Sequence, residues 1–326
     1  ALLVGLAFAD TERAIRRFMI GYVVLIVPAC LTVYLSVNYG DSFPVLQDVG
    51  ATLGSQIIIY DVGTALESHP GIFRVGEIAA WHAATAASFL IILATQDRSL
   101  AFRIVAGVVI VLLIGAIVLT GRRKMLMALT IFVVSQWALL AMFRRGVGRL
   151  TITVLVLGLF GSFALTLLDP ASEQALYLQR GVTVFDEAGE RVGTAFDLLR
   201  SAIYRSSGIG LGAGVTAQGA QHVGGAVAAA GGAGEAGLGK IILELGIPGA
   251  LAVVWLLVAL AARLFRNFDI LARTSDRMLY FAVSFVSLLI ANVATFAVAT
   301  QVYGDLFVLI ILGFVLGMIF SLNRAG

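Results

Sequence analysis

The sequence predicts an all-α protein, a polytopic bundle of transmembrane helices with a long outer-side loop between two spans. Three observations lead to this fold class. The 326-residue chain is 60% hydrophobic and only 13% charged, with a mean hydropathy of +1.00. Runs of about 20 apolar residues, the length that crosses about 30 Å of hydrocarbon, recur from end to end. These runs do not alternate in polarity, as the strands of a membrane barrel do.

The spans follow from these runs in order along the chain, which we treat as a single transmembrane domain over residues 1–326. Residues 1–9 are too short to span, and we expect them to be the end of a helix that begins upstream, with further spans before it. Eight segments are expected to cross the membrane: 18–37, 77–95, 102–120, 125–143, 150–168, 241–262, 278–299 and 305–322.

Two longer segments separate these spans. Segment 38–76 contains an apolar stretch, SQIIIYDVG, which is too short to cross and is expected to lie at the interface or to re-enter the membrane. Segment 169–240 contains a predicted short helix at 194–205 and ends in a Gly/Ala-rich tract. Such a tract suits either a flexible linker or a backbone packed closely around a ligand.

The basic residues set the orientation. Strict alternation of spans places 10–17, 96–103, 144–149 and 263–277 on one side, together with most of the arginines of short loops. Lys and Arg mark the cytoplasmic side, so that side is predicted to be cytoplasmic. The turn GRRK at 121–124 then faces outward, against the rule, on the same side as 38–76 and 169–240.

Arg122 and Arg123 in this turn have two interpretations. In the first, they are an exception to the positive-inside rule, and their side chains reach lipid headgroups. In the second, they bind an anionic group, most naturally phosphate on a lipid carrier. The pattern alone does not distinguish Arg74, Arg180 and Arg191 from ordinary surface charges.

Glu235 precedes the span at 241–262 by a few residues. A carboxyl group at the hydrocarbon boundary tends to have a raised pKa, which suits a general base near neutral pH. It is also placed to pair with Lys240. His222, in the glycine-rich tract, is a second candidate base.

Several functions lack their usual residues. Cys30 is the only cysteine, which excludes an intramolecular disulfide or a cluster of thiolate ligands. The three histidines have no metal-site spacing, and no GxxxxGK[ST] phosphate loop occurs. The net charge of +3 is distributed between spans, which does not favour nucleic-acid binding. We therefore expect no metal and no cofactor.

Together these features resemble the O-antigen ligase and polymerase superfamily of integral-membrane glycosyltransferases, from about Gly71 to Gly249. LTGRR is similar to the family's "T-x-S-R" signature, with Arg123 at the arginine position and Arg122 at the serine position. FRVGEIAAWHAATAA is similar to its "R-x-x-G" segment, which places Arg74 on the outer side.

Two further elements of the family lie in and after the long loop. Arg191, with Phe196 nearby and GIGLGAG after it, resembles the family's "R-x-x-x-W" and "G-x-G-x-G" elements. EAGLGKIILELGIPG keeps the spacing of the ligase pattern "H-N-x-x-L…E-x-G-I-x-G". Glu235 and Ala236 replace its His-Asn pair, which favours a polymerase of lipid-linked repeat units, or a related exopolysaccharide enzyme, over a ligase.

The resemblance implies metal-independent glycosyl transfer from a polyprenyl-diphosphate-linked saccharide to a saccharide or lipid-linked acceptor. In that reaction Arg123 and Arg191 would stabilise the diphosphate, Glu235 would deprotonate the acceptor, and Arg122, Arg74, Arg180 and His222 would bind substrate. The implied location is the outer face of a bacterial cytoplasmic membrane, among membrane lipids and other polysaccharide-assembly proteins. Two alternatives stay open: a transporter of lipid-linked saccharides, and a non-catalytic subunit of an export system.

Overall fold

The structure is a computed structural model that describes residues 1–8, 11–47, 58–61, 64–97, 99–143, 147–148, 150–155, 158, 173–186, 188–212 and 236–322. Its α-helices are α1 (Leu2–Phe8), α2 (Glu12–Tyr39), α4 (Gly76–Gln96), α5 (Leu100–Leu119), α6 (Lys124–Met142), α8 (Glu173–Asp186), α9 (Ala188–Arg205), α11 (Gly237–Thr274), α12 (Asp276–Val298) and α13 (Leu306–Ser321). Two strands, β1 (Ile58–Asp61) and β2 (Thr64–Glu67), pair antiparallel. Within the described residues, short 3₁₀ helices lie at Gly40–Ser42, Pro44–Leu46 and Gln301–Gly304.

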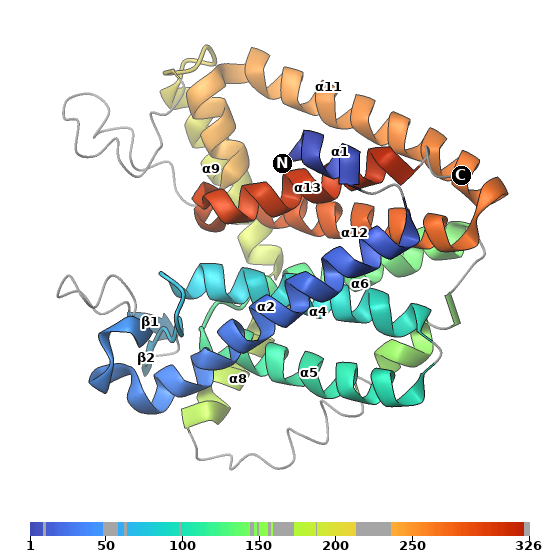
Figure 1. Ribbon diagram of the computed structural model, residues 1–326. Coiled ribbons are helices and arrows are strands. Elements are labelled where there is room, and N and C mark those ends of the chain that lie inside the picture. The colour runs from blue at the N-terminus through green and yellow to red at the C-terminus, as the bar shows by residue number, and fades with distance from the viewer. Residues whose placement is uncertain are drawn as a thin grey trace.

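Helix α4 forms the centre of the bundle (Figure 1). It packs against α2, α5, α6 and α12, and its side chains are buried along almost its whole length. Small residues such as Ala80, Ala83 and Ala87 let the neighbouring backbones approach closely. In a membrane the hydrophobic effect does not drive helices together, so they associate through close packing of this kind. The predicted all-α bundle is confirmed.

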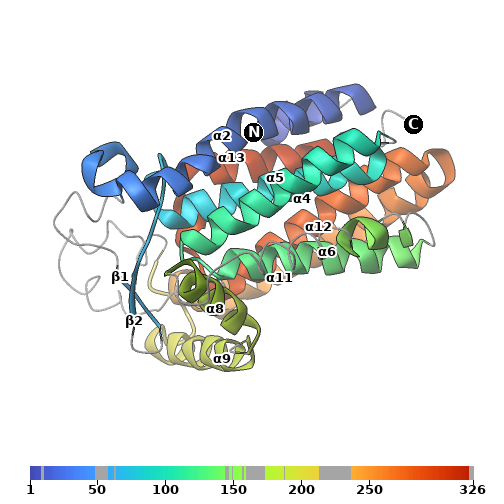
Figure 2. The ribbon, with the colours of Figure 1, turned by 90° about the horizontal axis from the view of Figure 1, so that it is seen from below.

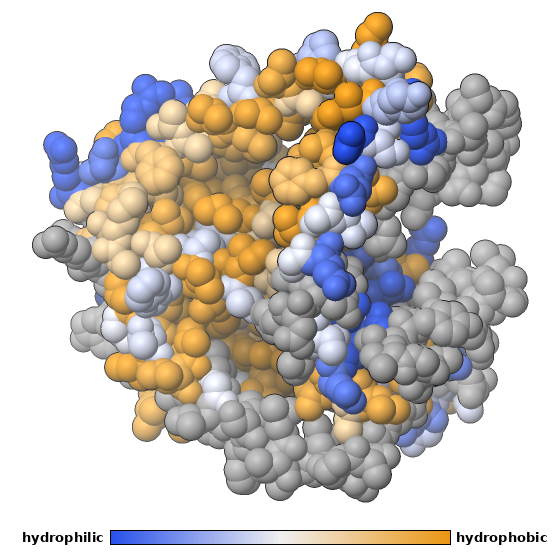
Figure 3. Space-filling model, turned by 180° about the vertical axis from the view of Figure 1, so that it is seen from behind, coloured by the Kyte–Doolittle hydropathy of each residue, from blue (hydrophilic) through white to orange (hydrophobic). Residues whose placement is uncertain are grey.

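The outer helices present apolar side chains to the surroundings. On α11, Leu251, Val254, Trp255 and Val258 are all more than half exposed. Figure 3 shows apolar residues over much of one face, with hydrophilic residues in a band to the right of its centre and at its upper left. A water-soluble protein rarely exposes so much contiguous apolar surface, whereas a membrane protein exposes it to lipid.

Six helices within the described residues are long and apolar enough to span a membrane: α2, α4, α5, α6, α11 and α12. Each corresponds to one expected span. The span expected at 305–322 is α13, which has 16 residues. Of the span expected at 150–168, residues 150–155 are helical, and 159–168 lie outside the described residues.

The structure differs from expectation in three places. Part of SQIIIYDVG forms β1, because a β-branched and aromatic run pairs with β2 in register Ile58 to Glu67. The helix expected at 194–205 begins at Ala188, and α8 precedes it. Helix α11 continues past the expected end at 262 to Thr274, because Leu264, Phe268 and Leu271 repeat at helical spacing and are buried.

Several buried polar side chains inside the bundle are paired with one another. The indole N–H of Trp81 on α4 donates to Oδ1 of Asn292 on α12 over 2.7 Å, and the hydroxyl of Tyr303 donates to the Asn292 carbonyl over 2.8 Å. The Tyr22 hydroxyl lies 2.7 Å from Nδ1 of His82. His82 is thus a packed structural residue of α4. These pairs satisfy polar atoms where no water is available.

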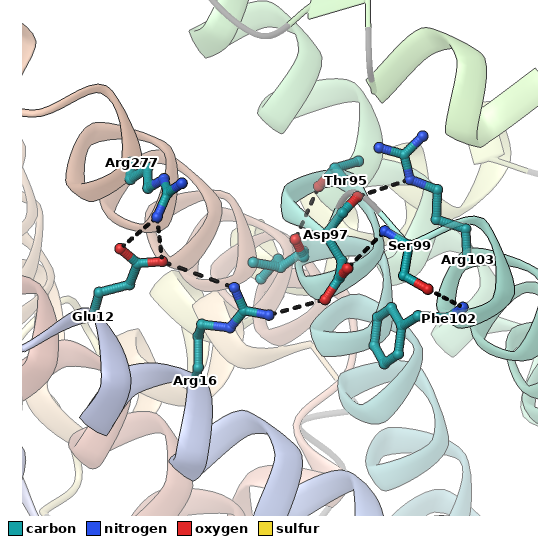
Figure 4. A network of polar contacts seen from close by, with 9 residues as sticks. Glu12, Arg16, Thr95, Asp97, Ser99, Phe102, Arg103 and Arg277 are labelled. Atoms are coloured by element: carbon teal, nitrogen blue, oxygen red, sulfur yellow. Dashed lines mark hydrogen bonds and ion pairs between the residues drawn. The ribbon is translucent and has the colours of Figure 1, made fainter.

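One end of the bundle carries a network of charges drawn in Figure 4. Arg16 bonds to Asp97 over 3.1 Å, and Arg277 bonds to both carboxylate oxygens of Glu12 over 3.2 Å. The N–H of Ser99 and the guanidinium of Arg16 hold the pKa of the Asp97 carboxyl below its usual value. Segments 10–17, 96–103 and 263–277 therefore meet at one end, as the alternation of spans predicts. Which end is cytoplasmic stays a prediction.

Candidate functional site

The GRRK turn connects α5 to α6 at the end opposite this network, where β1, β2, α8 and α9 also lie (Figure 2). Gly121 has a φ of 68°, a left-handed conformation that glycine adopts without a steric penalty. The Thr120 carbonyl accepts from the Ser68 hydroxyl over 3.1 Å, and the Thr120 hydroxyl accepts from the N–H of Arg122 over 3.3 Å. These bonds fix the turn, so its three cations project from a defined backbone.

Glu77, in the first turn of α4, binds two of these cations. Its Oε1 lies 2.8 Å from Nη1 of Arg122 and 3.9 Å from Nζ of Lys124. The Glu77 side chain is 9% exposed and that of Arg122 is 18% exposed, so the pair is largely removed from water. The carboxylate also lies at the N-terminus of a helix, where the macrodipole favours negative charge. Glu77 therefore holds the basic turn against the central helix.

Helix α8 contacts the same turn from the other side. Nη1 of Arg123 donates to the Thr183 hydroxyl over 2.7 Å, and that hydroxyl donates to the Arg180 carbonyl over 2.8 Å. Nε of Arg180 donates to the Gly121 carbonyl over 3.4 Å. Gly181 allows this close approach, since a Cβ there would come 3.2 Å from Leu126. Helix α8 thus brings a fourth cation, Arg180, to the turn.

Strand β2 and the chain after it complete this group. The Tyr177 hydroxyl of α8 donates to the Glu67 carbonyl over 2.7 Å and lies 3.2 Å from Nε2 of His69. A Cβ on Gly76 would come 2.3 Å from the Ser68 hydroxyl, so these segments are packed closely. The hairpin, the start of α4, the turn and α8 form one assembly, which we call the basic site. Its cations are Arg122, Arg123, Lys124 and Arg180, and Glu77 is the carboxylate paired with Arg122 and Lys124.

One donor in the basic site is still available. The buried Nε–H of Arg122 has no hydrogen-bond partner among the residues that the structure describes. A buried donor left unpaired costs about 1–3 kcal/mol, and an oxygen of an anionic ligand would relieve that cost. Within the described part of the chain, no group of three or more His, Cys, Asp or Glu side chains is arranged to hold a metal ion.

A second arrangement lies at the start of α11, where two glycine-containing segments bond to each other. In the turn after α9, the N–H of Leu211 donates to the Leu243 carbonyl over 2.8 Å, and the N–H of Ile247 donates to the Gly208 carbonyl over 2.8 Å. These bonds reach into a kink of α11 at Gly246, which has φ 68° and ψ −172°. GIGLG and ELGIPG, separate elements in the sequence, are therefore parts of one backbone junction.

The predicted site residues are distributed as follows. Arg122, Arg123 and Arg180 lie together in the basic site, and Arg74 lies exposed in the turn just before Gly76. Arg191 belongs to α9, which contacts α8 and α11, and its side chain lies outside what the structure describes. Glu235 and His222 also lie outside the described residues, although the adjoining Ala236 is buried and caps α11.

Sequence reasoning missed Glu77, Thr183 and Tyr177. Glu77 had a usable signal, because a carboxylate at the start of an apolar span is expensive to bury and needs a cationic partner. The other two residues sit in α8, and only the packing of that helix brings them to the turn.

Fold and site together define a polytopic helical membrane protein in which a cluster of arginines and the buried carboxylate of Glu77 lie at one end of the bundle. The chain matches no protein-family model, and no characterised protein is significantly similar to it in sequence.

Proposed function

We propose that the protein is a metal-independent membrane glycosyltransferase that polymerises or transfers saccharide units from a polyprenyl-diphosphate carrier. The observation that carries this proposal is the composition of the basic site, which brings Arg122, Arg123, Lys124 and Arg180 together at one end of the bundle. A cluster of guanidinium groups suits a diphosphate leaving group, whose developing negative charge needs stabilisation that arginine supplies without a metal. The unpaired Nε–H of Arg122 offers a further donor for a phosphate oxygen.

In this reaction a hydroxyl oxygen of the acceptor saccharide attacks the anomeric carbon of the donor. The bond from that carbon to the diphosphate oxygen breaks, and its electron pair leaves with the diphosphate. Arg123 and Arg180 bind the diphosphate from the turn and α8, and Arg191 of α9 adds a third guanidinium. Glu235 accepts the hydroxyl proton, with His222 as the alternative base. Arg122 and Arg74 contribute to binding the phosphate and saccharide.

The alternatives make different demands on the spans. A transporter that moves a charged headgroup across the bilayer needs polar or ionisable groups along a path between helices. Most of the polar groups described inside this bundle, such as Trp81 with Asn292, are bonded to each other, whereas Oε1 of Gln136 has no partner among the described residues. A non-catalytic subunit would keep the fold and the donor site yet lack turnover, so activity measurements decide between it and an enzyme.

The test uses purified protein in proteoliposomes, a polyprenyl-diphosphate-linked oligosaccharide and an acceptor of the same repeat unit. Arg123→Ala and Arg180→Ala should each lower product formation by about 100-fold or more. Arg123→Lys should recover little, because lysine lacks the bidentate fork. Arg277→Ala is the matched control, since this exposed arginine lies at the opposite end of the bundle. Unchanged turnover in both Ala variants would contradict the proposal.

The base is tested separately. Glu235→Gln should retain donor binding and lose turnover, and Glu235→His should keep part of it, because imidazole performs the same proton transfer. Normal turnover of Glu235→Gln together with an inactive His222→Ala would assign the base to His222. Donor binding without turnover by the unaltered protein, in the presence of acceptor, would favour the non-catalytic subunit. Movement of the donor across the bilayer without product would favour the transporter.

A further inference from the structure

Helix α9 is amphipathic, with an apolar strip along one side. Val192, Phe196 and Ile203 are separated by four and seven residues, so they lie on one face of the helix. Thr194 and Ser201 lie on the opposite face, each two residues from a member of the strip. A helix in the aqueous phase would hide such a strip against the protein.

Only one edge of this apolar face packs α9 onto the protein. Leu199 and Ala202 make that contact, against Ile242 and Leu243 of α11. Val192 remains 47% exposed and Phe196 remains 63% exposed. Two large apolar side chains of α9 are therefore open to the surroundings while the helix is held firmly on α11.

This exposed surface continues beyond α9. The turn after the helix exposes Ile209 by 80% and Leu211 by 47%, and its backbone is hydrogen-bonded to α11 at the kink. On α11 itself Ile247 and Leu251 are 42% and 64% exposed. From there the exposed apolar side chains run along the membrane-length part of the helix.

We infer that α9 and the turn at 206–212 lie within the headgroup–acyl boundary of the membrane, with phospholipid as their partner. The apolar strip and the turn contact acyl chains, and the face of Thr194 and Ser201 contacts water. Continuity with the lipid-facing surface of α11 selects lipid over a protein partner. Exposed Arg200, four residues after Phe196, is placed beside the strip, where interfacial helices carry cations for lipid phosphate. Phe196 and Tyr204 suit the same boundary, since aromatic side chains concentrate there.

The test measures the depth of single nitroxide labels in a Cys30→Ser protein reconstituted into phospholipid vesicles. Labels replace Phe196 and Ile203 on the strip, and Thr194 and Ser201 serve as matched controls on the opposite face. Oxygen concentrates in hydrocarbon, whereas a nickel chelate stays in water. We expect the ratio of oxygen to chelate collision rates to be several-fold higher at Phe196 and Ile203 than at Thr194 and Ser201. A label at Ile209 should resemble the strip.

High chelate access at the strip, equal to that at Thr194 and Ser201, would overturn the inference, because α9 would then be in water. Loss of access to both reagents at Phe196 and Ile203 would also overturn it, because protein would then cover the strip. No donor, acceptor or turnover enters this measurement. A lipid-inserted α9 in an inactive protein would therefore refute only the proposed function, and a water-exposed α9 in an active protein would refute only this inference.

Discussion

The ion pair between Glu77 and Arg122 joins the central helix to the basic turn, and its removal should destabilise the protein strongly. The two side chains are 9% and 18% exposed and their atoms are 2.8 Å apart. Removing one partner of a buried pair leaves the other charge uncompensated, which costs about 3–5 kcal/mol. We expect Glu77→Ala to lower the free energy of unfolding by about that amount.

Arg122→Ala should cost less than Glu77→Ala. After the arginine is removed, Glu77 keeps Lys124 at 3.9 Å and the N-terminus of α4 as sources of positive potential. After the carboxylate is removed, both Arg122 and Lys124 lose the counter-charge that α4 supplies. The asymmetry follows from three charges sharing one site, and a simple two-residue pair would not produce it.

The assay is a double-mutant cycle. Unfolding free energies of the parent, Glu77→Ala, Arg122→Ala and the double variant are obtained by denaturant titration in mixed micelles. A coupling energy of roughly 1.5–3 kcal/mol is expected, since residues in contact usually couple by up to about 3 kcal/mol. The matched control is the cycle of Glu12 and Arg277 at the other end, where Arg277 is 62% exposed. Exposed pairs contribute about 0–1 kcal/mol. A Glu77–Arg122 coupling no larger than that of the control cycle would refute the reasoning.

Three further outcomes are expected. In a Cys30-free protein, an impermeant thiol reagent applied from outside should label Ser172→Cys and spare Gly146→Cys; labelling of position 146 alone would reverse the predicted orientation. Gly246→Ala should destabilise the protein by about 1–3 kcal/mol, because φ 68° with ψ −172° suits glycine alone and the new Cβ would come 2.3 Å from the Ile209 carbonyl. Gly193→Ala in α9, where a Cβ meets nothing within 4 Å, is its control and should be neutral or stabilising. The lowered pKa of Asp97 means that its charge stabilises the fold above its unfolded pKa of about 3.9 and that this contribution is lost as the pH falls through the folded value. Asp97→Asn should therefore be less stable than the parent at pH 7 and equal to it in strong acid, and a gap that persists in acid would contradict this account.

Part of the basic site could be predicted from the sequence, because the GRRK turn places cations on the side of the membrane where the positive-inside rule does not expect them. The GRRK turn that contains Arg122 and Arg123 carries the cations of the short loops on its side of the bundle. The structure brings Arg180 to the same turn. The pairing of Glu77 with a cation could also have been predicted, because a buried carboxylate needs a partner. Thr183 and Tyr177 were not, because α8 is amphipathic and short, and nothing local shows which of its residues face the turn.

The sequence by itself determined the class of the protein and the position of most spans, since the length and apolarity needed to cross hydrocarbon are local properties. It also determined which loops share a side, because each span reverses the side. Only the tertiary structure decided how deeply each span is buried, since α12 and α11 are comparably apolar over a span yet α12 is mostly buried and α11 faces lipid. Only the tertiary structure paired GIGLG with ELGIPG and Glu77 with Arg122, because those contacts join residues whose proximity depends on how the helices pack.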